Sequence, residues 1–137
     1  MNGAISAGGA YFAIVFLCAF AIGTARVLLV APWVGDTLAV TLEAPIVLAI
    51  SWFATRLCVA RCHVPSAIAD RLLMGATAFT LLMLTETSVS AVAFHRTLQA
   101  QASALATPAG AIGLATQVAF ALMPAAAWVV DANRTRP

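Results

Sequence analysis

The chain has no lysine, and only 9% of its 137 residues carry a charged side chain, whereas soluble domains carry roughly 25%. All seven basic residues are arginine: Arg26, Arg56, Arg61, Arg71, Arg96, Arg134 and Arg136. They are too few and too scattered to build the clustered basic face that nucleic-acid binding requires. The scarcity of charge therefore excludes a soluble catalytic domain and excludes nucleic acid as a partner.

Apolar residues dominate instead, at 63% of the chain. They gather in four long segments, at about 11–34, 37–60, 68–94 and 109–130. Each segment exceeds the roughly 20 residues that a helix needs to cross a bilayer. Pro32, Gly35 and Asp36 supply a turn between the first two segments. We therefore predict an all-α fold, an antiparallel four-helix bundle in the lipid bilayer, with residues 1–137 forming one transmembrane domain.

The distribution of arginine predicts the orientation of this bundle. Four spans place both termini on one side of the membrane, together with the connection between the second and third spans. Five arginines fall on that side (Arg56, Arg61, Arg71, Arg134 and Arg136), against Arg96 on the other. By the positive-inside rule we expect cytoplasmic N- and C-termini. We expect the membrane to be a bacterial inner membrane.

Three charged residues lie well inside the predicted spans: Arg26, Glu43 and Glu86. Each costs roughly 2.5 to 3.5 kcal/mol near the bilayer centre, so each needs a partner or access to water. A helical hairpin that turns near 32–36 brings Arg26 level with position 43. Glu86 lies about five residues past the middle of its span, roughly 7 Å above the midplane. With Gln117 in the last span, these residues predict a buried polar cluster in the outer half of the membrane.

The charges of this cluster do not balance. One arginine and two ionised glutamates leave a net charge of minus one in a medium of low dielectric constant, so one glutamate binds a proton or a cation neutralises it. Because Glu43 is the expected partner of Arg26, Glu86 is the better candidate for the protonatable group. Pro124, in the last span, also frees the carbonyl of Phe120 from its helical hydrogen bond, and such carbonyls serve as ligands where they line a cavity.

The cluster permits two functions. A buried Arg26–Glu43 pair can simply fix the register of the hairpin, which suits a non-enzymatic accessory or structural subunit in a homo-oligomer or a larger membrane complex. Alternatively, Glu86 and Glu43 bind protons or cations in a small transporter or channel. We expect no enzymatic activity and no cofactor, because His63 and His95 both fall at span ends and no serine has a histidine within the membrane as a partner.

A weaker signal lies at the end of the second span. Cys58 and Cys62 share one helical face, with His63 adjacent, and three such side chains can hold a metal. The spacing departs from the usual two-residue gap of zinc and haem motifs. The predicted cytoplasmic location is reducing, which disfavours stable disulfides. We therefore expect free thiols at the membrane interface and no metal.

One further pattern is carried by the first two spans. The chain contains Gly23-Thr24-Ala25-Arg26, Ala31-Pro32, Gly35 and Glu43-Ala44-Pro45, with looser counterparts in Arg71-Leu72-Leu73-Met74-Gly75 and Phe120-Ala121-Leu122-Met123-Pro124. In these motifs it resembles a family of small four-span bacterial membrane proteins. The resemblance implies the four-span fold, and it brings no activity, ligand or catalytic residue with it.

Overall fold

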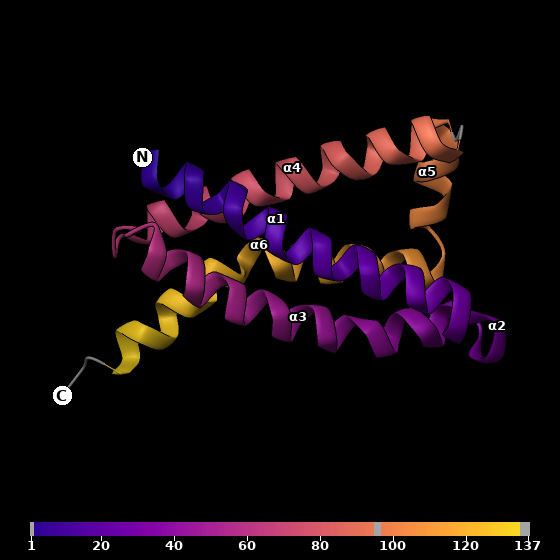
Figure 1. The fold of residues 1–137 in the computed structure, drawn as a ribbon, viewed down its shortest axis with the longest axis horizontal. Coiled ribbons are helices and arrows are strands. Elements are labelled where there is room, and N and C mark those ends of the chain that lie inside the picture. The colour runs from indigo at the N-terminus through magenta and orange to yellow at the C-terminus, as the bar shows by residue number, and fades with distance from the viewer. Residues whose placement is uncertain (1, 95–96, 135–137) are drawn as a thin grey trace.

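The computed structural model describes residues 2–94 and 97–134. Its elements are α1 (Asn2–Ala25), the π-helical segment η1 (Arg26–Val30), α2 (Ala31–Val34), α3 (Asp36–Arg61), α4 (Ile68–Phe94), α5 (Leu98–Leu105) and α6 (Pro108–Arg134) (Figure 1). The described residues contain no strand, so the all-helical prediction is confirmed. His95, Arg96 and Arg136, which entered the sequence arguments, lie outside the described residues.

Four helical stretches are long and apolar enough to cross a membrane: 3–34, 36–61, 68–92 and 108–133. The predicted spans match them closely except at the start, where the helix begins at Asn2, about nine residues before the predicted boundary. Residues 2–10 include small and polar residues that weaken an apolar signal. They are helical because several of them pack in the bundle, and Ala4 and Ala7 are fully buried.

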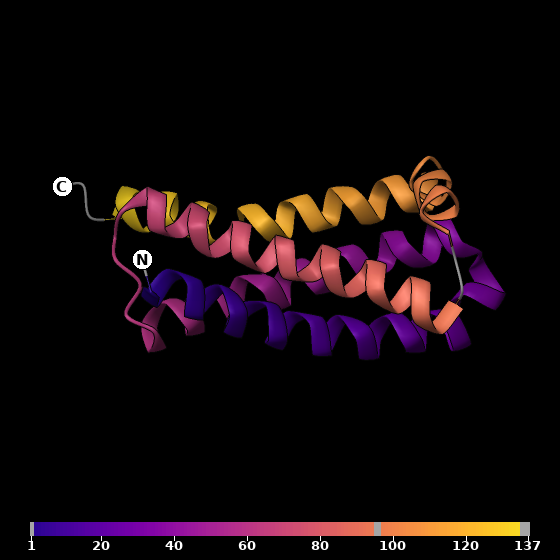
Figure 2. The same cartoon turned by 90° about the horizontal axis from the view of Figure 1, so that it is seen from above.

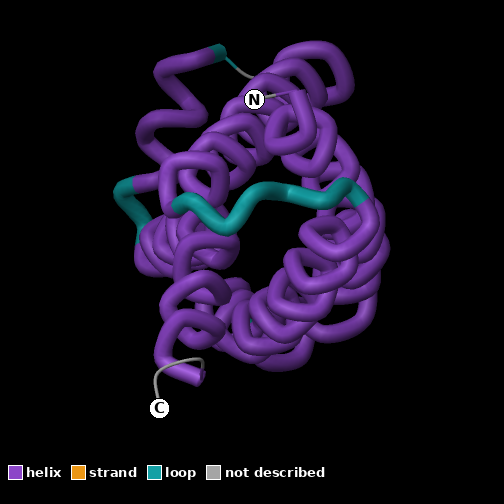
Figure 3. Tube along the Cα trace, turned by 90° about the vertical axis from the view of Figure 1, so that its left-hand side faces the viewer, coloured by secondary structure: helices purple, strands orange, loops and turns teal. Residues whose placement is uncertain are grey.

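The four long helices are arranged in a ring. α1 packs against α3 and α4, and α6 packs against the same two helices, so α1 and α6 lie on one diagonal. Although α3 and α4 follow each other in the chain, they occupy the other diagonal, and residues 62–67 cross the end of the ring to join them (Figure 3). We call this end, where both termini also lie, the termini end, and the end that carries α2 and α5 the far end (Figures 1 and 2).

Proline shapes the helix that leads to the far end. Pro32 has no backbone N–H to bond the carbonyl of Leu28, and its ring crowds the preceding turn. The chain widens there into η1, in which the N–H of Ala31 bonds to the carbonyl of Arg26, a π-type spacing. The helix then continues to Val34 and reverses at Gly35, whose φ of 82° favours glycine. The turn between the first two spans is therefore shorter than the sequence predicted, because Pro32 and Asp36 are both helical and Gly35 alone separates α2 from α3.

Two glycines mark where helices approach most closely. A Cβ added at Gly8 would lie 2.7 Å from the Met74 carbonyl oxygen, so α1 and α4 pack with almost no space between them. A Cβ at Gly75 would overlap the Ala121 carbonyl, which holds α4 against α6 in the same way. Small residues at helix contacts are expected for bundles in lipid, where van der Waals contact drives association.

A buried aromatic pair lies at the centre of the ring. Tyr11 is 0% exposed, its ring stacks on Phe120 at 4.6 Å between centroids, and its hydroxyl donates a hydrogen bond of 2.9 Å to the Phe120 carbonyl oxygen. That is the carbonyl that Pro124 leaves free four residues later. The tyrosine thus satisfies a backbone acceptor that the helix itself cannot satisfy. Outside this core, large apolar side chains such as Trp33 and Phe53 face outward.

Candidate functional site

A cavity of about 780 Å³ opens between the long helices in the half of the bundle nearer the far end. Its polar lining comprises Arg26, Asp36, Glu43, Glu86, Ser90, Thr107, Thr116 and Gln117. The four residues that the sequence singled out therefore all border one space. Its volume falls in the range of small-molecule sites, which is roughly 300–1,000 Å³.

Arg26 and Glu43 form one wall. Arg26 opens η1 and Glu43 lies in the second turn of α3, and the Arg26 Nε is 2.5 Å from the Glu43 Oε2. Gly23, one turn before Arg26, leaves room for the carboxylate, since a Cβ there would lie 3.4 Å from Glu43 Oε1. The ion pair that hairpin geometry predicts is present, and it closes α1 onto α3.

Glu86 and Gln117 form another wall, from α4 and α6. The Gln117 Nε2 donates hydrogen bonds of 2.8 and 2.7 Å to the two carboxylate oxygens of Glu86. Within the described residues, no arginine forms an ion pair with Glu86. An amide donor compensates part of the negative charge without cancelling it, so Glu86 keeps the capacity to bind a proton or a cation.

The four residues thus form two pairs and not one compact cluster. Each pair joins two helices that are neighbours in the ring, α1 with α3 and α4 with α6. The expectation of a buried cluster is corrected in one respect: the side chains of Arg26 and Glu43 are 22% and 16% exposed, and Glu86 is exposed as well. The reason is the cavity, which separates the pairs and lets the polar groups face open space.

The remaining walls of the cavity are apolar. Phe12, Phe16, Phe20 and Phe120 contribute aromatic rings, and Leu82 and several valines complete the lining. Phe120, stacked on the buried Tyr11, lies on the side of the cavity that faces the termini end. Gly113 also borders the cavity, and a Cβ there would meet nothing within 4 Å. Its lack of a side chain therefore leaves space in the cavity.

The weaker candidate site is not assembled. Cys58 is buried in α3, Cys62 is partly exposed at its end, and His63 is exposed with a left-handed φ of 50°. Among the described residues no three His, Cys, Asp or Glu side chains form a group that could hold a metal.

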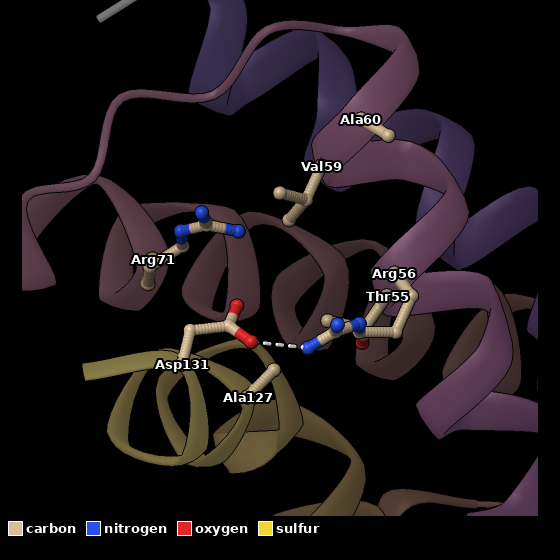
Figure 4. Close-up of a pocket in the computed structure, with 7 residues that line it drawn as sticks. All are labelled: Thr55, Arg56, Val59, Ala60, Arg71, Ala127 and Asp131. Atoms are coloured by element: carbon tan, nitrogen blue, oxygen red, sulfur yellow. Dashed lines mark hydrogen bonds and ion pairs between the residues drawn. The ribbon is translucent and has the colours of Figure 1, made fainter. Parts of the chain in front are cut away.

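Sequence reasoning missed a second polar group, at the termini end. Arg56 of α3 forms an ion pair of 2.5 Å with Asp131 of α6, and Arg71 of α4 lies beside them (Figure 4). The two arginines entered the sequence analysis only as markers of orientation. A usable signal existed, because the four-span topology puts Arg56, Arg71 and Asp131 at the same end of three helices.

The comparisons with known proteins add no identification. No protein-family model matches the chain, and neither a curated protein nor a solved structure matches it. The functional argument therefore depends on the geometry of the chain itself.

Proposed function

We propose that the chain is a non-enzymatic integral membrane protein, an antiparallel four-helix bundle whose far-end cavity binds a small apolar cation at Glu86. The cation would exchange with a proton on the same carboxylate. The observation that carries the proposal is the difference between the two glutamates: Glu43 is paired with an arginine at 2.5 Å, whereas the partner of Glu86 among the described residues is an amide.

The chemistry of the walls supports this class of ligand. Aromatic faces attract cations, and an apolar lining with a few placed polar groups is typical of small-molecule sites. Here four phenylalanines border the same space as the Glu86 carboxylate. An anion would meet that carboxylate, and a neutral polar solute would lose its hydration against the apolar walls. A cation with an apolar body satisfies both features.

The arginine distribution supports an orientation in which the termini end faces the cytoplasm of a bacterial inner membrane and the cavity faces the outer side. Tyr11 and Phe120 stack between the cavity and the termini end. A transport pathway through a single copy of the chain would have to pass the stacked rings of Tyr11 and Phe120. We therefore propose that transport, where it occurs, uses a homo-oligomer or a partner subunit.

A binding measurement tests the proposal. The probe is tetraphenylphosphonium, an apolar monovalent cation, added to the purified full chain in detergent and followed by equilibrium dialysis. We expect Glu86→Gln to weaken binding at least tenfold, since each factor of ten corresponds to about 1.4 kcal/mol. Asp36→Asn is the matched control, because Asp36 borders the same cavity but is exposed at the start of α3.

The control variant should bind within about twofold of wild type. Equal affinity of the wild-type and Glu86→Gln proteins would contradict the proposal. So would an equal loss in Asp36→Asn, because that result would indicate a diffuse effect of charge. Circular dichroism of each variant establishes that it is folded before binding is compared.

One observation favours a second function. The Arg26–Glu43 pair joins two consecutive helices at their far ends, which suits a purely structural accessory subunit. In that case Glu86→Gln leaves binding partners and oligomeric state unchanged. The chain is then purified either in a complex with other membrane proteins or as a homo-oligomer. Size-exclusion chromatography with light scattering, run alongside the dialysis, separates the two functions.

A further inference from the structure

A second cavity, of about 170 Å³, lies toward the termini end between α3, α4 and α6 (Figure 4). It is lined by Thr55, Arg56, Val59, Ala60, Arg71, Ala127 and Asp131. It shares no residue with the far-end cavity. Its volume exceeds what one water needs, which is about 10–15 Å³ by the same measure.

Arg71 is the unusual residue of this cavity. Its residue surface is 6% exposed, and its buried Nε donates no hydrogen bond to any residue that the structure describes. A buried charged donor without an acceptor is costly, and native structures rarely contain one. Figure 4 shows the guanidinium groups of Arg71 and Arg56 approaching the Asp131 carboxylate from different helices. Arg71 therefore borders the cavity with its guanidinium group, while protein atoms cover its Nε.

Among the described residues that line this space, positive charges outnumber negative charges. Two guanidinium groups, of Arg56 and Arg71, border it with one carboxylate, that of Asp131. Asp131 forms the 2.5 Å ion pair with Arg56 and also attracts Arg71. Asp70, which precedes Arg71, attracts it as well but does not line the cavity. An acceptor that brings one further negative charge would balance the lining.

The cavity lies near the boundary between the lipid headgroups and the hydrocarbon core. Arg71 is three residues inside α4 and Arg56 is five residues from the end of α3, which places them roughly 5–8 Å from the helix ends. A 26-residue helix is about 39 Å long and extends past both sides of a hydrocarbon core of about 30 Å. Two tryptophans lie nearby: the Arg56 Cζ is 5.9 Å from the Trp52 ring, and Trp128 bonds to the Ser66 carbonyl. Tryptophan is enriched at this level of a membrane.

We propose that this cavity binds a phosphate oxyanion, presented by the headgroup of an anionic phospholipid. Arginine presents several N–H donors in a geometry that matches phosphate oxygens, and basic pockets between helices near the membrane surface suit anionic headgroups. Arg71 donates to the phosphate from inside the bundle and Arg56 from the rim. The lipid would thereby join α3, α4 and α6 at the termini end.

The experiment measures lipid binding to the delipidated full chain in detergent by native mass spectrometry. The probes are phosphatidylglycerol, which is anionic, and phosphatidylcholine, whose headgroup has no net charge, with inorganic phosphate titrated in a separate arm. We expect phosphatidylglycerol to bind in preference to phosphatidylcholine. Inorganic phosphate, which lacks acyl chains to anchor it, should bind far more weakly.

Three variants locate the site. Arg71→Gln removes the buried donor, and Ala60→Leu narrows the cavity from an exposed position while leaving every charge in place. Each should weaken phosphatidylglycerol binding about tenfold or more. Arg71→Gln does so because charge-assisted hydrogen bonds are lost, and Ala60→Leu does so because the larger side chain takes up space in the cavity. Arg61→Gln is the matched control: it removes an exposed arginine from the same end of α3, outside the cavity, and should change binding less than twofold.

The outcomes are decisive in both directions. Should Arg71→Gln fail to fold, Ala60→Leu still tests the site. Wild-type affinity in Ala60→Leu, or a loss in Arg61→Gln equal to that in Arg71→Gln, overturns the proposal. Equal binding of the two lipids overturns it too. Tight binding of inorganic phosphate without lipid preference would show that the oxyanion comes from solution and not from a headgroup.

Discussion

The ion pair between Arg26 and Glu43 makes a measurable prediction about stability. At the Nε–Oε2 distance of 2.5 Å and an effective dielectric constant of about 20, the gross Coulomb attraction is roughly 7 kcal/mol. Removing two ions from water costs several kcal/mol for each ion. Because these side chains are 22% and 16% exposed, part of the hydration is retained. We therefore expect a net coupling of about 1–3 kcal/mol.

A double-mutant cycle isolates this coupling. The variants are Arg26→Gln, Glu43→Gln and the double variant, each unfolded with SDS in mixed micelles and followed by circular dichroism. Each single variant leaves a charge in the cavity wall without its partner, whereas the double variant leaves neither charge. The double variant should therefore be more stable than the sum of the single losses predicts.

The Arg56–Asp131 pair is a control with the same 2.5 Å separation. Its side chains are 42% and 45% exposed, so water screens them more strongly. Exposed pairs contribute about 0–1 kcal/mol, and a cycle with Arg56→Gln and Asp131→Asn should fall in that range. A coupling for Arg26–Glu43 no larger than the control would refute the argument that the cavity wall strengthens the pair.

Two other substitutions test the packing, by the same unfolding assay. Gly75→Ala should destabilise the bundle by about 1–3 kcal/mol, because the added Cβ would overlap the Ala121 carbonyl. In the control variant Gly113→Ala, the added Cβ meets nothing within 4 Å, so the change should be neutral or slightly stabilising. Equal losses of stability in the two variants would contradict the packing argument. Tyr11→Phe should cost about 1–3 kcal/mol, since it leaves the Phe120 carbonyl buried without a donor, and an unchanged stability would show that this hydrogen bond contributes nothing.

Several features of the site could be predicted because they depend on distance along a helix. Arg26 and Glu43 flank a single turn, so the rise per residue is enough to place them at one level. The same argument placed Glu86 in the outer half of the membrane, and Gln117 was included in the same predicted cluster. The hydrogen bond between them needs a further fact, that α4 and α6 are neighbours in the ring. Periodicity within one helix carries no information about which helix lies beside it.

Other features could not be predicted from patterns within single segments. The first span was expected to begin at about residue 11, which would leave Tyr11 at a helix end. The helix starts at Asn2 instead and carries Tyr11 into the core. Arg71 has the sequence context of an exposed residue near a loop, yet α6 and α3 cover it. In both cases burial depends on neighbours that are distant in the chain.

The amino-acid sequence alone determined four apolar helices of membrane-spanning length, their boundaries within a few residues over most of the chain, and the pairing of Arg26 with Glu43 across the first turn. These are local properties, set by side-chain hydropathy and by the fixed rise of a helix. The tertiary structure decided the order of helices in the ring, the separation of the polar residues into two pairs across a cavity, and the second cavity around Arg71. These features depend on how the side chains of different helices pack against one another. The sequence of a single segment does not contain that information.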